Sequence, residues 1–378
     1  MSPNGIFAQE STLLLYPAFK CVEQYAMHGL ILSFTTAFIL TYLIIPVIIR
    51  VAKERRIFDR PNERSSHAEP TPSLGGIGIF AGAISAIVLW TPLNVFGPLQ
   101  YILAAFILIF LLGVLDDLVP VSPVKKFVGQ LFVAVILTYK ANIQITSFYG
   151  VFGIEELPAL TSFSLSILII VGITNAFNLI DGINGLAGSI GLLTCSILGA
   201  WFFAVGLMSF SVVAFSLAGA IVAFLKYNFT PARIFMGDTG SLLIGTVCAI
   251  LAIKFIEANH NIPANNPFVL GGAPTIAIAI LILPIYDTLS AFVRRVAKGQ
   301  SPFSPDKKHI HHQLLRLGLT HTQTTLLLMI INLLFVVIAF SLHRLGTKFL
   351  LMLELILTSI LGLILHWLDS RNAVKTSV

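Results

Sequence analysis

The sequence predicts an all-α polytopic membrane protein with about eleven transmembrane helices. Of its 378 residues, 56% are hydrophobic and only 11% are charged, whereas roughly 25% of the residues in a soluble domain are charged. Runs of about 17 to 20 apolar residues recur along the chain, and such a run is long enough to cross a hydrocarbon core of about 30 Å as a helix. Lys and Arg are also distributed unequally between the two sides that these spans would define.

Eleven apolar segments are candidate spans, and the fourth of them is the shortest. They are Leu30–Ile49, Leu74–Trp90, Tyr101–Leu115, Phe127–Tyr139, Phe163–Ile180, Leu186–Val205, Met208–Leu225, Leu242–Ile256, Phe268–Ile285, Thr325–Leu342 and Phe349–Leu368. We find no linker or internal repeat. We therefore expect one membrane domain over 30–368, an external N-terminal tail over 1–29 and a cytoplasmic C-terminal tail over 369–378.

The basic residues predict the orientation, because short cytoplasmic loops are enriched in Lys and Arg. With the C-terminus inside, the outer side holds only Lys20, Lys140, Lys254, Arg344 and Lys348, and the inner side holds the other 18 of the 23 basic residues. An odd number of spans then places the N-terminus outside. Every aspartate also falls on the inner side. This sorting favours an enzyme that works at the cytoplasmic face over a transporter with a site at the midplane of the membrane.

The first two inner loops carry charged candidates for binding and catalysis. His67 lies in a basic loop that would bind an anionic ligand, with contact to anionic lipid as the alternative. Asp116 and Asp117 directly follow an apolar run, where a charge at membrane depth costs about 2.5–3.5 kcal/mol. They indicate metal binding or acid–base chemistry, unless the helix simply ends at Leu115 and the pair is solvated. Lys125, with Lys126, would pair with these carboxylates or contact phosphate.

The third inner loop reads NAFNLIDGINGLAGS. Asn175, Asn178 and Asp181 are three residues apart, so on a helix they form one polar stripe. Asn184 follows on a turn bounded by two glycines. Amide and carboxylate groups offer the donors and acceptors that bind a nucleobase or a ribose. The alternative is a structural helix break.

The fourth loop places Asp238 in the sequence FMGDTGS, at the start of an apolar span. Mg²⁺ takes hard oxygen ligands and typically one or two carboxylates, so Asp238 and Asp116 are candidate ligands of Mg²⁺, with Mn²⁺ as an alternative. Arg233 is placed to help with negative charge. The competing interpretation is that Asp238 only caps the helix.

The fifth and longest inner loop, from Arg294 to Gly318, contains His309, His311 and His312 among several cations. No cysteine accompanies these histidines, and their spacing matches no common zinc site. Phosphate binding fits better. An ordinary basic inner loop would account for the Lys and Arg residues but not for three clustered histidines.

Four motifs in this order resemble the polyprenyl-phosphate N-acetylhexosaminyl-1-phosphate transferase family of bacterial envelope synthesis. They are LDD at Leu115–Asp117, NLIDGINGLA at Asn178–Ala187, FMGDTGS at Phe235–Ser241 and HIHH at His309–His312. The resemblance implies a cytoplasmic-membrane enzyme that moves a sugar 1-phosphate from a UDP-N-acetylhexosamine to a polyprenyl phosphate and releases UMP. It makes the membrane and these two substrates the expected partners, with no nucleic acid and with a homodimer as one oligomeric state.

The resemblance also implies roles for single residues. Asp238 matches the magnesium-binding aspartate, and Asp117 of the acidic pair is the favoured residue to deprotonate or orient the attacking lipid phosphate. Asn178 and Asp181 match positions near the nucleotide. The three histidines of HIHH match a motif that contacts phosphate. Direct attack on the β-phosphorus and a phospho-enzyme intermediate both remain open.

The histidine motif favours one branch of the family. The muramyl-pentapeptide enzymes have three consecutive histidines followed by Phe-Glu, whereas this chain has HIHHQLL. The chain looks more like the branch that starts O-antigen, common-antigen or teichoic-acid chains, so UDP-GlcNAc is the expected donor. Another UDP-N-acetylhexosamine and the muramyl-pentapeptide donor are alternatives, and a polytopic transporter is a remote one.

Overall fold

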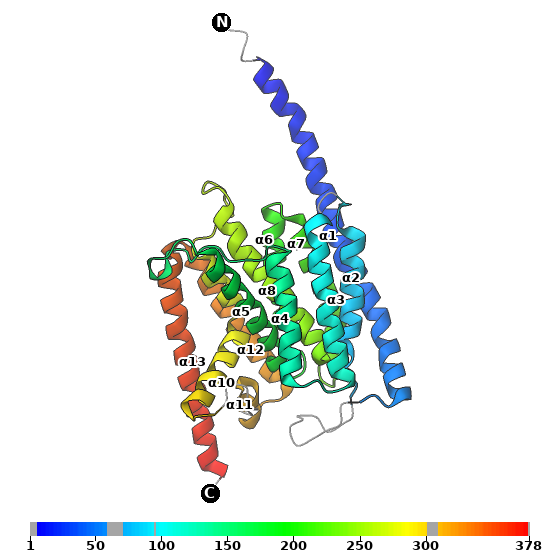
Figure 1. Cartoon of the computed structure of the whole chain (residues 1–378), viewed down its shortest axis with the longest axis vertical. Coiled ribbons are helices and arrows are strands. Elements are labelled where there is room, and N and C mark those ends of the chain that lie inside the picture. Colours follow the sequence, from blue (N-terminus) through cyan, green and yellow to red (C-terminus); the bar gives the residue numbers. More distant parts are fainter. Residues whose placement is uncertain (1–5, 59–70, 94–95, 301–308, 377–378) are drawn as a thin grey trace.

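A computed structural model describes residues 6–58, 71–93, 96–300 and 309–376, and it has a helix at each of the eleven predicted spans. The helices form one bundle, with the two chain termini at its opposite ends (Figure 1). The helices are α1 Ile6–Arg55, α2 Gly75–Trp90, α3 Phe96–Leu118, α4 Pro123–Tyr139, α5 Ala159–Ile180, α6 Leu186–Ala204, α7 Met208–Asn228, α8 Gly237–Asn261, α9 Ala273–Ile280, α10 Ile282–Ala297, α11 Ile310–Arg316, α12 His321–Ser341 and α13 Gly346–Thr376. Two 3₁₀ turns, Val151–Gly153 and His343–Leu345, complete the helical elements of the described residues.

The predicted all-helical, multi-pass membrane architecture is confirmed. Eight of the described helices are long and apolar enough to cross a membrane alone, and the bent pair α9–α10 would make a ninth. The count of eleven is not confirmed, because α2 has only 16 residues and α4 is also too short to be counted. Which end of the bundle faces the cytoplasm stays a prediction.

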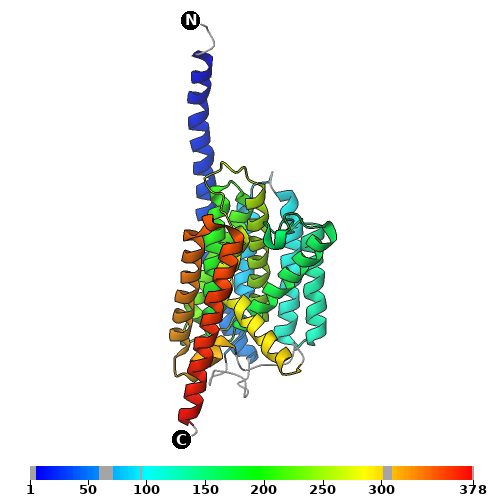
Figure 2. The same ribbon diagram turned by 90° about the vertical axis from the view of Figure 1, so that its left-hand side faces the viewer.

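The two predicted tails are helical where they are described. α1 runs without interruption from Ile6 to Arg55, so residues 6–29 continue the helix of the first span. Figure 2 shows this helix extending well beyond the rest of the bundle. α13 likewise continues to Thr376, past the predicted end of the last span at Leu368.

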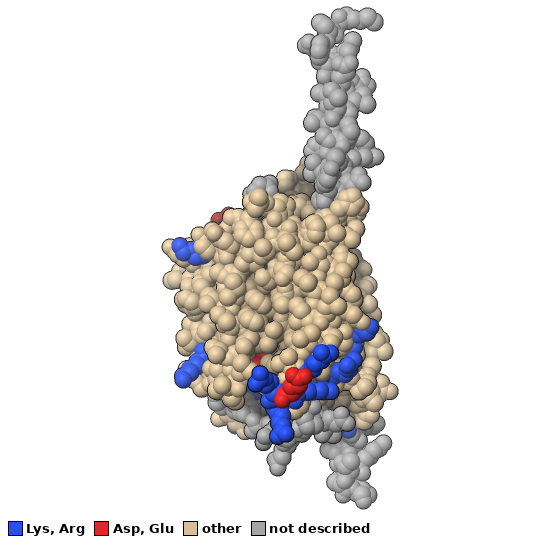
Figure 3. Space-filling view, turned by 90° about the vertical axis from the view of Figure 1, so that its right-hand side faces the viewer, with Lys and Arg blue, Asp and Glu red and all other residues tan. Residues whose placement is uncertain are grey.

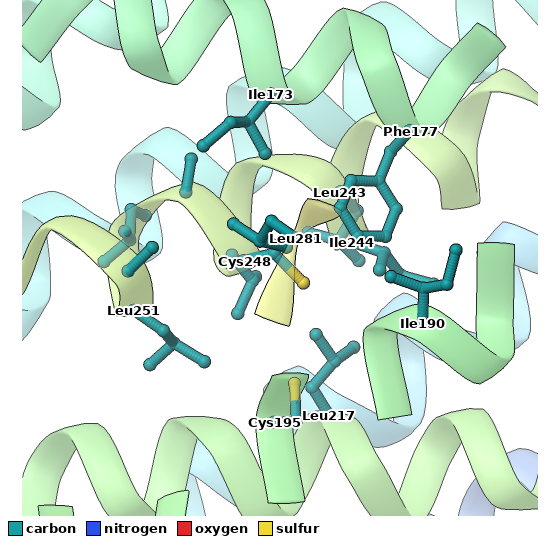
Figure 4. Close-up of a cluster of buried hydrophobic side chains, with 14 of the residues drawn as sticks. Ile173, Phe177, Ile190, Cys195, Leu217, Leu243, Ile244, Cys248, Leu251 and Leu281 are labelled. Carbon is teal, nitrogen blue, oxygen red and sulfur yellow. The ribbon is translucent and has the colours of Figure 1, made fainter. Parts of the chain in front are cut away.

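Helix α8 is the centre of the bundle, because it contacts α2, α3, α5, α6, α7 and α9. Every residue of α8 from Thr239 to Ile253 is buried, and the next residue, Lys254, is partly buried. Figure 4 shows part of this packing around Leu243, Ile244, Cys248 and Leu251 of α8, with Phe177, Ile190, Cys195 and Leu217 from its neighbours. A helix that is apolar all round is stable only when it is enclosed in this way. The start of α8 is therefore held firmly in place.

Glycines let two neighbouring helices approach the first turn of α8. A Cβ on Gly76 of α2 would overlap the backbone of Gly240, and a Cβ on Gly113 of α3 would overlap the backbone of Thr239. Small residues at such crossings allow close van der Waals packing between helix backbones in a membrane protein. The start of α8 thus lies against both α2 and α3.

The ninth predicted span, Phe268–Ile285, is not one straight helix. α9 and α10 meet at Leu281 with a bend of 80°. Pro284 has no N–H with which to bond the carbonyl of Ile280, four residues earlier. Asn332 of α12 instead donates from Nδ2 to the carbonyl oxygens of Ile280 (3.1 Å) and Ala279 (3.3 Å). The bend is therefore stabilised from a neighbouring helix.

Helices α3 and α5 end and α8 begins at the lower end of the bundle (Figure 1), and charged side chains gather near this end (Figure 3). On the face that the figure shows, Lys and Arg lie together with an acidic side chain near this end, and the broad surface above them is largely uncharged. Large apolar side chains such as Leu43 on α1 and Leu363 on α13 are exposed. An uncharged surface of this kind suits contact with lipid chains.

Close packing at Gly76 gives a first prediction. Gly76→Ala should lower the thermal midpoint of the protein in detergent, because the added Cβ overlaps Gly240 and overpacking costs about 1–3 kcal/mol. Gly97→Ala is the matched control: Gly97 also lies in the first turn of a helix, and a Cβ there would have no atom within 4 Å. Equal thermal midpoints for the two variants would contradict the close α2–α8 contact.

Candidate active site

The carboxylate of Asp117, at the end of α3, holds the start of α8. It accepts hydrogen bonds from the backbone N–H of Asp238 (2.7 Å), from the backbone N–H of Thr239 (3.0 Å) and from Thr239 Oγ1 (2.5 Å). The first N–H groups of a helix have no partner within the helix and lie at the positive end of its dipole. Asp117 therefore stabilises the turn that carries Asp238 and fixes the position of that residue.

Three oxygen atoms converge on the ammonium group of Lys126, in the first turns of α4. Asp116 Oδ2 lies 2.9 Å from Lys126 Nζ, Asp238 Oδ2 forms a second ion pair with it, and Asn178 Oδ1 lies at 3.4 Å. Asn178 Nδ2 also donates to the other oxygen of Asp238, at 2.7 Å. The cluster thus joins the ends of α3, α4, α5 and α8, and we call these four residues the carboxylate–lysine cluster.

The glycine before Asp238 is required by the same geometry. Gly237 has a positive φ of 72°, and a Cβ there would lie 2.7 Å from Asp117 Oδ2. Only glycine adopts this backbone conformation without a steric penalty. The preceding residues pair with the start of α2, where Gly75 N–H donates to the Phe235 carbonyl (2.9 Å) and Gly76 N–H donates to that of Met236 (2.8 Å). The FMGDTGS motif is therefore held by two helices.

The loop after α5 lies beside this cluster. Burial raises the pKa of Asp181 well above its usual value, and the negative charges of Asp238 and Asp117 raise it further. Asn184 is buried, and its Nδ2 donates to Thr230 Oγ1 at 3.1 Å. The pKa of Asp181 therefore responds to the charge of Asp238 in the carboxylate–lysine cluster. Asn184 connects its loop to the segment before α8 through a hydrogen bond.

Asn175, the first member of the predicted polar stripe, has a different partner. Its Nδ2 donates to Gln130 Oε1 of α4 (2.5 Å) and to the carbonyl of Val171 (2.9 Å). The contact with Gln130 joins α5 to α4, whereas Val171 lies on α5 itself. Of the stripe, Asn178 alone has a described hydrogen bond to Asp238, and the predicted contact of Asn175 with substrate stays a prediction.

The three histidines form a second cluster, which Asp287 of α10 holds. His309 Nδ1 lies 2.8 Å from Asp287 Oδ2, and the rings of His309 and His311 are nearly parallel at 5.8 Å. The rings of His311 and His312 are 4.3 Å apart. Burial lowers the pKa of His311 to about 3, although the nearby charge of Asp287 opposes this shift, so His311 is neutral at neutral pH.

Gly182 connects the two clusters. A Cβ on Gly182 would overlap Nε2 of His311, so the backbone after Asp181 packs directly on that ring. The NLIDG sequence thus contacts the histidines through Gly182 and interacts electrostatically with Asp117 and Asp238 through Asp181. The second, third, fourth and fifth predicted loops therefore meet at one end of the bundle.

The remaining predicted residues lie at the edges of this region or outside the description. Lys125 is exposed at the start of α4, and Arg294 is half-buried on α10. The guanidinium carbon of Arg233 lies 5.7 Å from the centre of the Tyr227 ring. His67 lies outside the described residues.

Two residues in the site were missed or under-weighted by sequence reasoning. Lys125 and Lys126 were both expected to pair with the carboxylates or contact phosphate, but only Lys125 was selected as a substrate-binding residue, and it is Lys126 that makes the described ion pairs to Asp116 and Asp238. Asp287 was not singled out at all, although a lone aspartate in the apolar segment PIYDTLSAF was a usable signal, because charges in such segments are costly unless paired.

Comparison with known proteins identifies the family. A family model described as Glycosyl transferase family 4 matches residues 99–256, which include four of the aspartates discussed above. The chain is also 34% identical over 313 residues to a Bacillus subtilis (strain 168) protein named probable undecaprenyl-phosphate N-acetylglucosaminyl 1-phosphate transferase. That match covers 82% of this chain and 84% of the relative. The chain belongs to glycosyl transferase family 4.

Other relatives of this family 4 protein have related names. A Mycolicibacterium smegmatis protein named decaprenyl-phosphate N-acetylglucosaminephosphotransferase is 32% identical over 78% of this chain and 77% of its own length. A Yersinia pestis protein named undecaprenyl-phosphate alpha-N-acetylglucosaminyl 1-phosphate transferase is 30% identical over 79% of this chain and 81% of its own length.

The contact between Asp117 and Thr239 can be tested in this family 4 protein by removing one hydrogen bond. Thr239→Val keeps the side-chain shape but removes the hydroxyl that donates to Asp117, and hydrogen bonds to charged groups contribute about 1.5–3 kcal/mol. We expect a lower thermal midpoint than for Thr239→Ser, which retains the hydroxyl. If the serine variant were the less stable of the two, the hydrogen bond would not be what holds α8.

Proposed function

We propose that the protein transfers N-acetylglucosamine 1-phosphate from UDP-GlcNAc to a polyprenyl phosphate and releases UMP. The carboxylate–lysine cluster carries this proposal, because it gathers two carboxylates, a cation and an amide beside a histidine cluster suited to phosphate. The names of all three relatives specify N-acetylglucosamine and a polyprenyl phosphate. Two of them specify undecaprenyl and one decaprenyl, so the proposal does not extend to the length of the lipid.

The reaction exchanges one phosphorus–oxygen bond for another. An oxygen of the lipid phosphate bonds to the β-phosphorus of the UDP-sugar, and the bond from that phosphorus to UMP breaks. The sugar stays attached to its own phosphate throughout. Because both substrates are anionic, the site needs fixed positive charge to bring them together and to stabilise the transition state. Lys126 supplies such a charge within the carboxylate–lysine cluster.

The donor set around Lys126 fits a magnesium ion. Asp116, Asp238 and Asn178 each direct one oxygen at the same positively charged atom, so hard oxygen donors already converge there. No group of three His, Cys, Asp or Glu side chains suited to a metal occurs among the described residues. Mg²⁺ does not need one, since it uses one or two carboxylates and completes its shell with water and phosphate.

Asp238 and Asp116 would hold the Mg²⁺, with Mn²⁺ as an alternative, and the bound ion would neutralise phosphate charge. Asp117 acts mainly by holding Asp238, because both of its oxygens already accept hydrogen bonds from α8. An additional role for Asp117 as the base stays a prediction. Asn178, Asp181 and Asn184 bind the nucleotide, and the histidines bind phosphate.

An apolar cavity of about 390 Å³ supports a lipid acceptor. It lies between α5, α8, α9 and α10, and its lining includes Ile173 of α5, Ile253 of α8 and Leu289 of α10. Leu289 is two residues from Asp287, so the cavity reaches the helix that holds the histidine cluster. The polyprenyl tail occupies this cavity with its phosphate toward the lower end of the bundle.

The lower end of the bundle faces the cytoplasm of a bacterial cell, and the protein lies in the cytoplasmic membrane, where it starts an envelope polysaccharide. The support is the concentration of Lys and Arg in the loops of this end. Two of the five basic residues predicted for the outer side lie at the opposite end of the bundle. Lys140 follows the last residue of α4, and Lys348 lies in the first turn of α13.

The donor can be identified with purified protein, undecaprenyl phosphate and Mg²⁺. UDP-GlcNAc should yield UMP and a lipid-linked sugar in equal amounts, whereas UDP-MurNAc-pentapeptide should yield neither. UDP-GalNAc in a third reaction measures discrimination at the sugar, which depends on a few hydrogen bonds. Turnover of the pentapeptide donor alone would contradict the branch assignment. Solute transport without UMP release would favour a transporter instead.

The metal assignment is tested by Asp238→Asn, which keeps the size of the side chain but removes its charge. Activity should fall by about 10²-fold or more, the usual cost of removing one electrostatic stabiliser. Mg²⁺ should raise the thermal midpoint of the parent but not that of Asp238→Asn, because the variant lacks the charged ligand. Retention of both properties would mean that Asp238 only caps α8.

A further inference from the structure

Asp287 is a buried carboxylate that none of the roles above requires. It lies on α10, its side chain is 1% exposed, and its two oxygens have different partners. Oδ2 is 2.8 Å from His309 Nδ1, and Oδ1 accepts a hydrogen bond from the backbone N–H of Ile310, also at 2.8 Å. One carboxylate thus contacts both the first histidine of HIHH and the first residue of α11.

The first contact determines which nitrogen of His309 carries a hydrogen. An ionised carboxylate can only accept hydrogen bonds, so Nδ1 of His309 is the donor. In the neutral ring Nε2 then has no hydrogen, and it is the nitrogen that can accept a proton or, once protonated, donate to a phosphate oxygen. Carboxylates that orient a functional histidine act in the same way at metal sites and in catalytic triads.

The second contact fixes where the histidines lie. α11 has only seven residues, and its first N–H group is satisfied by Asp287. The ring of His309 lies parallel to that of His311, which packs in turn on Gly182. The position of Asp287 depends on the bend at Leu281, because α10 begins there.

We propose that Asp287 is the positioning residue of the histidine cluster: it sets the tautomer of His309 and fixes the start of α11. It does not touch the substrate. Asp287 acts through His309, so its effect on turnover rests on the proposed function, whereas its effect on the tautomer does not.

Asp287→Asn separates the two contacts. The amide oxygen can still accept from Ile310 N–H, so the start of α11 is retained, but Nδ2 would then donate to His309 Nδ1 and force the hydrogen to Nε2. A reversed tautomer costs about 10⁴-fold in kcat in a serine protease triad. We expect kcat to fall by about 10²-fold or more, with little change in the KM for UDP-GlcNAc. Asp287→Leu removes both contacts and should also lower the thermal midpoint.

Two measurements separate positioning from simple structural support. In protein labelled with ¹⁵N-histidine, the His309 signal, assigned by its loss in His309→Gln, should report a protonated Nδ1 in the parent and a protonated Nε2 in Asp287→Asn. The double variant Asp287→Asn, His309→Gln should be no slower than the worse single variant, because residues that act as one unit are not additive. Ser290→Ala is the control, since among the described residues the Ser290 hydroxyl donates to the backbone carbonyl of Asp287 and not to its side chain, and its kcat should match the parent.

The results that would overturn the proposal are distinct from those that would overturn the proposed function. An unchanged His309 tautomer in Asp287→Asn, parental kcat in that variant, or multiplicative losses in the double variant would each reject the positioning role. If the parent released no UMP from UDP-GlcNAc, the proposed function would fail, yet the ¹⁵N measurement would still decide whether Asp287 sets the tautomer.

Discussion

The three hydrogen bonds from the first turn of α8 to Asp117 are the interaction on which the rest of the site depends. They join the end of α3 to the start of the most buried helix in the bundle. Because α8 is enclosed by six other helices, its first turn has little freedom to move. Asp238 lies in this turn, so its position is fixed as well. A carboxylate at a helix N-terminus is favourable on its own, and here the same contact sets the geometry of the charged cluster.

Charge is tolerated in the carboxylate–lysine cluster because its two carboxylates are paired with Lys126, and the neighbouring Asp117 accepts hydrogen bonds from α8. Lys126 compensates two of the carboxylates, and Asp181, which has no such cation described beside it, is shifted toward its neutral form. Removing one partner would leave a buried charge without compensation. The free-energy cost of such a charge is larger than the net stabilisation that the ion pair provides. The carboxylate–lysine cluster should therefore respond as a unit when one member is changed.

The bend between α9 and α10 has a comparable role for the second cluster. Pro284 opens the backbone, Asn332 of α12 satisfies the carbonyls left at the break, and α10 then carries Asp287 to His309. Residues of two separate helices, α10 and α12, thus position one histidine. The NLIDG turn lies between the two clusters, because Gly182 packs on His311 and Asp181 interacts electrostatically with Asp117 and Asp238.

The sequence alone was sufficient for the membrane class and for the approximate positions of the long apolar helices, and it selected the loops that the structure brings together. Long apolar runs and isolated charges can be read from short stretches of sequence. An apolar run of about 20 residues is long enough to span the membrane, and a charge within such a run is costly unless it has a partner. Asp116, Asn178 and Asp238 could be selected for the same reason, since each polar group stands at the end of an apolar helix.

Only the tertiary structure decided which of these groups meet. Lys126 rather than Lys125 reaches the carboxylates because α4 begins at Pro123 and so sets the direction of each side chain. Asn175 faces Gln130 on α4 instead of Asp238. The pairing of Asp287 with His309 depends on an 80° bend whose carbonyls are satisfied from another helix. Such contacts join residues far apart in the chain, and no local pattern specifies them, because they depend on how the helices pack.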